Sequence, residues 1–216
     1  MCMEYNKHKD FFNKAYKTGS DVWTNIRIQL KGAQFMEKLP PGASVLDIGS
    51  GRGVFANELA AAGFTVTGID FEEEIVTKAN MEIKVAGLSP KVNFIVADAF
   101  NMPFADNSFD GVCAVGFLEN IYSEDWKRYS DEVTRVLKPG GVYLDISLSR
   151  KAKVYTGVSP INSANGEFDI GDVHYHFFEK EEMRDIFAGK LNLIYQEVKF
   201  IEKPRETALL ESLFQK

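Results

Sequence analysis

The sequence predicts an α/β fold in which helices cover both faces of a mostly parallel sheet. Two observations carry this prediction. Apolar runs alternate with helical patterns from residue 44 to about 149, and a glycine-rich turn follows the first apolar run. Strands that alternate with helices pair in parallel, because each helix returns the chain to the same end of the sheet. The 216 residues, of which 45% are hydrophobic, fit one domain with a sizeable core.

The alternating region contains five expected strands and three expected helices. The strands are Ser44–Ile48, Thr65–Ile69, Val92–Val96, Gly111–Val115 and Val142–Ser147. The helices are Val54–Ala62, Glu73–Ala86 and Glu124–Leu137. Between the third and fourth strands, Pro103 and the polar residues after it favour a loop over a helix.

Amphipathic spacing predicts two helices ahead of this region, at Phe11–Tyr16 and Val22–Leu39, and Pro40-Pro41-Gly42 ends the second. After the region, residues 150–173 are polar and rich in glycine, and an irregular stretch of this length is usually a lid, a binding loop or disordered.

A helix is then expected at Glu179–Ala188 and a long strand at Leu191–Ile201, with Leu191, Leu193 and Tyr195 on one face. The segment Ala208–Phe214 fits a helix or a strand equally well by its pattern alone.

The glycine turn is the most informative feature. Three glycines at alternate positions, Gly49, Gly51 and Gly53, allow positive φ angles and let a ligand lie against bare peptide. At the carboxyl end of the first strand of a parallel sheet, such a turn binds nucleotide-like ligands. A dinucleotide site would place a third glycine where Val54 stands, and the Gly-x-x-x-x-Gly-Lys phosphate loop is absent. The sequence therefore disfavours both a nicotinamide dinucleotide and ATP.

The composition limits the kinds of partner that we expect for this protein. The formal net charge is −6 and no basic block occurs, which disfavours nucleic acid. No apolar run approaches the ~20 residues of a membrane span, and the amino terminus lacks the apolar core of a secretory signal. Cys2 and Cys113 imply no disulfide framework. We expect a cytoplasmic protein, a monomer or a homodimer, that acts on a small molecule.

Five segments, in order and at suitable spacing, resemble the motifs of the class I S-adenosylmethionine-dependent methyltransferases. They are VLDIGSGRG (45–53), VTGIDF (66–71), FIVADAFNMPF (94–104), FDGVCAVGFLENI (109–121) and RVLKPGGVYLDIS (135–147). The resemblance extends from about Ala43 to the end of the chain. It implies a Rossmann-like seven-stranded sheet whose last strand is antiparallel and lies beside strand five, so we assign Ala208–Phe214 as that strand.

The resemblance also implies a division of the chain. Residues 1–42 would form an amino-terminal helical cap, and residues 43–216 would form the methyltransferase domain, with residues 150–173 as a lid. In the thiopurine- and tellurite-methyltransferase-like branch, a Thr-Gly-x-x-x-Trp motif resembles residues 18–23, which would place Trp23 near the cofactor.

The same resemblance gives each cofactor-binding residue a role. Gly49, Ser50 and Gly51 would pass the backbone close to the methionine moiety, and Asp47 would hold its ammonium group. Asp70 would accept hydrogen bonds from the ribose hydroxyls, a role that a carboxylate also has in dinucleotide sites. The remaining expected contacts are Phe71, Asp98 and Ala99 around the adenine, and Val115 and Gly116 near the sulfonium.

Methyl transfer from an activated sulfonium needs alignment and exclusion of water, so no catalytic triad is required. Glu119, His174 and His176 are the weak candidates for a base, and packing roles are the alternative for both histidines. Candidate acceptor contacts are Tyr16, Asn120, Tyr122, Tyr155 and Tyr175. Two histidines without a nearby cysteine or carboxylate cluster make a poor metal site, and we expect none.

The function expected from these observations is transfer of a methyl group from S-adenosylmethionine to a small molecule. The alternatives are a protein or RNA methyltransferase and a regulatory protein that binds the cofactor without chemistry. The strand-four segment lacks an Asn/Asp-Pro-Pro-Tyr/Phe motif, which argues against methylation of base amino groups in DNA or RNA.

Overall fold

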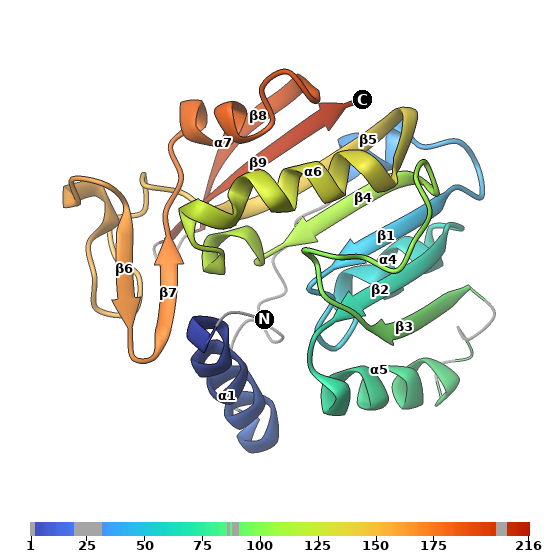
Figure 1. Cartoon of the computed structure of the whole chain (residues 1–216), viewed down its shortest axis with the longest axis horizontal. Coiled ribbons are helices and arrows are strands. Elements are labelled where there is room, and N and C mark those ends of the chain that lie inside the picture. The colour runs from blue at the N-terminus through green and yellow to red at the C-terminus, as the bar shows by residue number, and fades with distance from the viewer. Residues whose placement is uncertain (1–2, 20–31, 86, 88–90, 202–206) are drawn as a thin grey trace.

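A computed structural model describes residues 3–19, 32–85, 87, 91–201 and 207–216. Its centre is a seven-stranded sheet with the order β3-β2-β1-β4-β5-β9-β8 (Figure 1). The strands are β1 (Ser44–Ile48), β2 (Thr65–Asp70), β3 (Val92–Val96), β4 (Phe109–Val115), β5 (Leu137–Leu148), β8 (Asn192–Ile201) and β9 (Thr207–Gln215). The helices are α1 (Met3–Thr18), α3 (Ala33–Lys38), α4 (Val54–Ala61), α5 (Glu73–Val85), α6 (Trp126–Val136) and α7 (Lys180–Ile186).

The strand directions confirm the predicted fold class. Strands β1 to β5 pair in parallel, whereas β9 is antiparallel both to β5 and to β8. The segment that fits either helix or strand by its pattern is therefore a strand, and it lies in the position that the resemblance implies.

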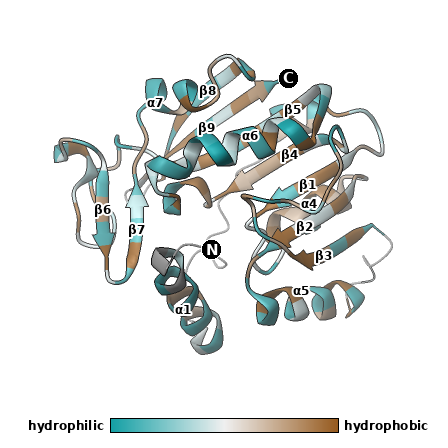
Figure 2. Cartoon of the chain, in the orientation of Figure 1, coloured by the Kyte–Doolittle hydropathy of each residue, from teal (hydrophilic) through white to brown (hydrophobic). Residues whose placement is uncertain are grey.

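Helices cover both faces of the sheet, as predicted. One hydrophobic cluster joins α3, α4 and α5 to the first face, and a second joins α6 and α7 to the other. Strand β1 contributes Val45 to the first cluster and Leu46 and Ile48 to the second, because successive side chains of a strand point to opposite faces. Figure 2 shows the result, with hydrophobic central strands behind a hydrophilic outer surface of α6.

Helix α6 illustrates how the sequence forms these layers. Tyr129, Val133 and Val136 recur at helical spacing and are buried, while the opposite face carries charged residues. Helix α7 begins with a reciprocal capping box in which the Glu179 N–H donates to the Glu182 carboxylate. In the described part of the chain, no helix combines the length and apolar character that a bilayer crossing requires.

The prediction for residues 150–173 is wrong in one respect. The segment is not irregular throughout, since β6 (Glu167–Ile170) pairs antiparallel with β7 (Val173–His176) in a separate hairpin. Only Gly171 and Asp172 separate the two strands, and Gly171 has a φ of +65°. A two-residue turn that starts with glycine is typical of a tight hairpin.

The shared face predicted for Leu191, Leu193 and Tyr195 is confirmed for the two leucines, which pack on the second cluster, and is wrong for Tyr195. The pairing of β8 with β9 is irregular between Leu193 and Tyr195, and Leu193 packs on the second cluster whereas Tyr195 packs on the first. A bulge adds one residue to a strand and so reverses the faces that follow it. Of the helix predicted over residues 22–39, the structure describes only the end, α3, and Trp23 lies outside the described residues.

Candidate functional site

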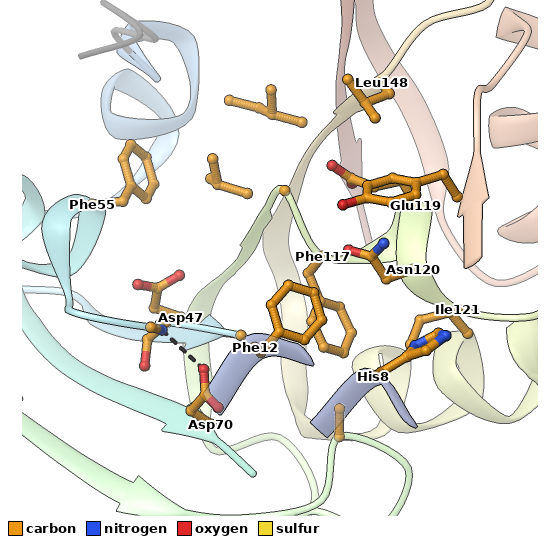
Figure 3. A pocket seen from close by; sticks show the side chains of 18 of the residues that line it. His8, Phe12, Asp47, Phe55, Asp70, Phe117, Glu119, Asn120, Ile121 and Leu148 are labelled. Carbon is orange, nitrogen blue, oxygen red and sulfur yellow. Dashed lines mark hydrogen bonds between the residues drawn. The ribbon is translucent and has the colours of Figure 1, made fainter. Parts of the chain in front are cut away.

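A cavity of about 660 Å³ opens at the carboxyl ends of the parallel strands, and its size is in the range typical of small-molecule sites. Residues from β1, β2, β4 and β5 line it, together with α1 and the segment 154–156. It lies where the order of strands reverses direction, with β2 on one side of β1 and β4 on the other. Figure 3 shows Asp47 and Asp70 on one side and Glu119, Asn120 and His8 on the other.

The glycine turn forms one wall of this cavity. Gly49 and Gly51 have φ angles of +69° and +51°, and the N–H groups of Gly49 and Ser50 both donate to the carbonyl of Ile69. A Cβ on Gly49 would lie 2.4 Å from Cδ2 of Phe117, so a side chain at this position would displace that ring. A Cβ on Gly51 would lie 2.9 Å from the hydroxyl of Tyr16 on α1. Both positions therefore require bare backbone.

Asp70 ends β2 with its carboxylate inside the cavity wall. One oxygen accepts the N–H of Gly51 at 3.0 Å, and the other accepts the N–H of Glu72 at 3.0 Å. Burial raises its pKa, and backbone hydrogen bonds from Glu72, Gly51 and Phe71 oppose the rise. A carboxylate has about four acceptor positions, so acceptor capacity remains for a hydroxyl of a ligand.

Asp47 lies on β1 and is almost completely buried. Its Oδ1 accepts the thiol of Cys113 at 3.5 Å, and burial raises its pKa to about 7. Such a carboxyl becomes fully ionised when a cation comes to lie beside it. Asp47 therefore suits a positively charged ligand group.

The other predicted contacts of the cofactor also line the cavity where they are described. They are Ser50, Phe71, Asp98, Ala99, Val115 and Gly116. Oδ1 of Asp98 accepts the N–H of Phe100 at 2.8 Å, which fixes the carboxylate at the end of the strand-three segment.

The described lining carries more acidic than basic side chains. Asp47, Asp70, Asp98, Glu58 and Glu119 face Arg52, the one lysine or arginine among the described lining residues. The Nη2 of Arg52 donates to the carbonyl of Tyr16, and its guanidinium lies 5.9 Å from the centre of that ring. This imbalance favours a cationic ligand.

Glu119 and Asn120 belong to the 3₁₀ helix η1 (Leu118–Asn120) that follows β4, and both line the cavity. The Asn120 amide donates to the carbonyl of His174 at 2.8 Å and so ties η1 to β7. Glu119 is only 6% exposed, its Oε2 has no hydrogen-bond partner among the described residues, and burial raises its pKa to about 8. A buried carboxyl oxygen without a partner is costly, which makes Glu119 a candidate functional group.

Three of the predicted acceptor contacts, Tyr16, Tyr155 and Tyr175, line the cavity, whereas Tyr122 does not. Tyr122 stacks between the rings of His8 and His174, with ring centroids 5.6 and 4.5 Å away.

His174 and His176 also lie outside the cavity lining. His176 packs against the rings of Trp126 and Phe178, and burial lowers its pKa to about 4. These surroundings fit the packing alternative for both histidines.

The sequence prediction missed the apolar residues that α1 contributes. Tyr5, His8 and Phe12 line the cavity together with Tyr16. His8, Phe12 and Tyr16 follow Tyr5 by three, seven and eleven residues. This spacing puts them on one face of a helix, which is the signal that could have revealed them. Other lining residues that the prediction missed are Phe55, Phe117, Ile146, Leu148, Ile201 and Leu209.

Among the described residues, no three histidine, cysteine or acidic side chains gather as metal ligands would. The cavity therefore has two parts. One side has a wall of bare peptide and two buried aspartates, and the other side is an apolar chamber with one carboxyl group.

Comparison with known proteins finds similar sequences and structures. Residues 46–144 match the family model described as a methyltransferase domain. The sterol 24-C-methyltransferase ERG6B of Gibberella zeae is 40% identical over 112 residues, which cover 49% of this chain and 27% of that protein. The ubiquinone/menaquinone biosynthesis C-methyltransferase UbiE of Geotalea daltonii is 32% identical over 147 residues, which cover 65% of this chain and 59% of that protein.

A solved structure of a SAM-dependent methyltransferase from Methanosarcina mazei matches this chain with a TM-score of 0.72 and 27% sequence identity. The match covers 83% of this chain and 95% of the solved chain. The chain spans between about a quarter and three fifths of the length of the two curated relatives.

Proposed function

We propose that the chain is an S-adenosylmethionine-dependent methyltransferase that transfers a methyl group to an apolar small molecule. Residues 46–144 match a methyltransferase-domain model, and the fold is similar to that of a solved SAM-dependent methyltransferase. The observation that carries this proposal is the pairing of Asp70 with the glycine turn. Its carboxylate accepts the Gly51 N–H at the carboxyl end of β2 and keeps acceptor capacity free for a ribose diol.

The residues around Asp70 fit the rest of this cofactor. Asp47, buried and readily ionised by a neighbouring cation, would hold the ammonium group, while Gly49, Ser50 and Gly51 would carry the methionine chain. Phe71, Asp98 and Ala99 would surround the adenine, and Val115 and Gly116 would face the sulfonium. Trp23 stays a prediction outside the described residues.

The bound cofactor supplies a methyl group that is already activated as a sulfonium. The protein then has to orient the acceptor and exclude water, and orientation alone can contribute ~7–11 kcal/mol. Phe12, Phe55, Phe117 and Leu148 give the chamber apolar walls that suit both tasks. Charge is neutralised when an uncharged acceptor is methylated, so a dry site favours the reaction.

The acceptor is proposed from the lining of the chamber. Beyond the cofactor residues, the walls are mainly aliphatic and aromatic, with Glu119 of η1 as an acidic group. The names of the two curated relatives, a sterol and a quinone methyltransferase, agree with an apolar acceptor. An acceptor of this kind would contact Tyr16, Tyr155 and Tyr175.

Residues 1–42 and 150–173 would act as a cap and a lid over this acceptor. Support comes from α1 and from Val154, Tyr155 and Thr156, which line the cavity opposite the sheet. A cytoplasmic location and a monomeric or homodimeric state remain predictions of the sequence.

The test is transfer of labelled methyl groups from S-adenosylmethionine to a panel that contains an isoprenoid quinol, a sterol and flat heteroaromatic N–H compounds. We expect label in the apolar extract with at least one of them, and much slower labelling with Asp70→Ala at the same subsaturating cofactor concentration. Binding of S-adenosylhomocysteine without transfer to any compound would favour a regulatory cofactor-binding protein. Label in added protein or RNA would favour the macromolecular alternative.

A further inference from the structure

The Glu119 carboxyl lies at the cavity end of a buried polar chain. Behind it, Tyr143, Asp145 and Ser147 alternate along β5, and strand geometry puts all three side chains on one face. Asp145 and Ser147 are completely buried, and neither lines the cavity. They reach the cavity only through Glu119, on which Ser147 acts by a side-chain hydrogen bond.

Hydrogen bonds link the three polar side chains of β5 through Asp145. Ser147 Oγ donates to Asp145 Oδ1 at 2.6 Å, and Tyr143 Oη donates to Asp145 Oδ2 at 2.9 Å. Tyr143 Oη also lies 2.9 Å from Tyr129 Oη on α6.

Ser147 has a single hydroxyl proton, which allows two arrangements. When Ser147 donates to Asp145, it can accept only from a protonated Glu119. When Ser147 donates to Glu119, Asp145 must hold the proton and donate it to Ser147. The two arrangements differ by the passage of one proton along Glu119, Ser147 and Asp145.

We propose that Glu119, Ser147 and Asp145 share one proton and relay it, so that Glu119 removes a dissociable O–H or N–H proton from the methyl acceptor. The proposal rests on the proposed function and narrows its acceptor to molecules whose attacking atom carries such a proton. Glu119 is the catalytic residue in this scheme, and Ser147 and Asp145 are positioning residues.

The step balances without any further reactant. The relay first moves the shared proton from Glu119 to Asp145, which leaves an anionic Oε2 at the cavity. An electron pair of the acceptor oxygen or nitrogen forms the new bond to the methyl carbon, and the electrons of the broken carbon–sulfur bond stay on sulfur as a thioether. The acceptor proton passes to Oε2 of Glu119, and its release to solvent after product departure restores the single shared proton.

The surroundings support a shared proton. Burial raises the pKa of Glu119 to about 8 and that of Asp145 to about 7, and the charge of Asp145 opposes ionisation of Glu119. The other titratable groups that face the pair are Tyr175 on β7, Tyr129 on α6 and Tyr143 on β5, all with pKa values raised by burial. None of these three competes for the proton at neutral pH.

The test is a pH titration of the carboxyl ¹³C resonances by NMR in the full chain without ligand, with Glu119→Gln and Asp145→Asn used to assign the two signals. Asp145→Asn should lower the pKa of Glu119 by roughly one pH unit or more. The variant removes a neighbouring negative charge, and its amide donates to Ser147, which then donates to Glu119. Ser147→Ala should raise the same pKa, because the hydrogen bond that stabilises the carboxylate is lost.

Tyr129→Phe is the matched control, since it removes a hydroxyl from the far end of the chain and should leave the pKa of Glu119 near its wild-type value. A pKa of Glu119 that is the same in Asp145→Asn, Ser147→Ala and wild type would overturn the relay. So would a wild-type pKa in the ordinary range of ~4.3. Since the titration uses no cofactor, its outcome is separate from the binding and transfer experiments that test the proposed function.

Discussion

At the scale of single residues, two buried aspartates have different roles in the half of the cavity that is proposed to hold the cofactor. Asp70 is held by two backbone N–H donors, whereas Asp47 has the thiol of Cys113 as its side-chain donor. We therefore expect Asp70 to stay in place and accept hydrogen bonds from hydroxyl groups. We expect Asp47 to ionise when a cation lies beside it.

Replacing Asp70 by Ala should weaken the binding of S-adenosylhomocysteine by about 1.5–3 kcal/mol, the worth of hydrogen bonds to a charged group. Isothermal titration calorimetry measures this change. Asp106→Asn is the matched control, because Asp106 is an exposed carboxylate paired with Arg135 away from the cavity. Equal affinities for Asp70→Ala and the control would exclude the ribose role.

Gly49→Ala should lower both the free energy of unfolding and the affinity for S-adenosylhomocysteine. Alanine at a left-handed φ costs about 1–2 kcal/mol, and its Cβ would also meet the ring of Phe117. Gly42→Ala separates the two effects, since Gly42 has a φ of +73° with nothing within 4 Å of a Cβ. Urea unfolding should show the larger loss at Gly49. Equal losses at both positions would mean that the close approach of Phe117 is unimportant.

The affinity for S-adenosylhomocysteine should fall as the pH drops below about 7. Its ammonium group would bind the ionised form of Asp47, whose pKa burial raises to about 7, so a proton must be displaced at lower pH. The loss approaches ~1.36 kcal/mol for each pH unit. Calorimetry between pH 5.5 and 8 on wild type and Asp47→Asn checks this. The same slope in both proteins would assign the pH dependence to another group.

At the scale of elements, helix α1 is held over the cavity by aromatic side chains and one buried acceptor. Nε2 of His8 accepts the N–H of His174 at 3.1 Å, and Tyr5 donates to Asp125 at 2.9 Å. Burial lowers the pKa of His8 to about 4, so its ring stays neutral and able to accept at neutral pH. Protonation of His8 would remove that acceptor, so its contribution to the free energy of unfolding is complete above pH ~6.5 and declines as the pH falls towards 4, where the ring takes up a proton in the folded state.

His8→Ala should loosen α1 and the β6–β7 hairpin together. Loss of one buried hydrogen bond of about 1 kcal/mol predicts about fivefold faster amide hydrogen exchange in both elements at pH 7. Lys7→Ala is the matched control, because Lys7 is exposed on the same helix. Unchanged exchange in the hairpin of His8→Ala would show that α1 docks independently of β7.

The elements also show what the sequence could and could not predict. The strands of the alternating region and the helices between them were predicted closely, because hydrophobic periodicity and the glycine turn are local signals. The β6–β7 hairpin was missed although Gly171-Asp172 is a local turn signal. The bulge in β8 has no such signal, since it arises from pairing with β9.

The functional site also has a part that local sequence signals predict and a part that they do not. Its cofactor half comes from motifs at strand ends, so each described residue predicted for that half lines the cavity. The acceptor half depends on contacts between distant segments. Tyr122 stacks between His8 and His174 rather than in the cavity wall, and the chain from Tyr129 to Ser147 forms only when α6 packs on β5. Tertiary packing of this kind leaves no pattern in a single sequence.

At the scale of the whole molecule, the cavity at one edge of the sheet has two sides. One side is proposed to bind a cation, and the other side is apolar. The carboxyl ends of β1 and β2 supply the aspartates, whereas β5, η1 and α1 supply the acceptor chamber (Figure 3). The excess of acidic over basic groups in the described lining suits a sulfonium and disfavours a ligand that carries phosphates.

Calorimetric titration of the wild-type chain with S-adenosylhomocysteine and, in parallel, with NADH tests this account most directly. The account predicts saturable one-to-one binding of the sulfur nucleoside and no measurable binding of the dinucleotide. Saturable binding of NADH together with no affinity for S-adenosylhomocysteine would contradict it.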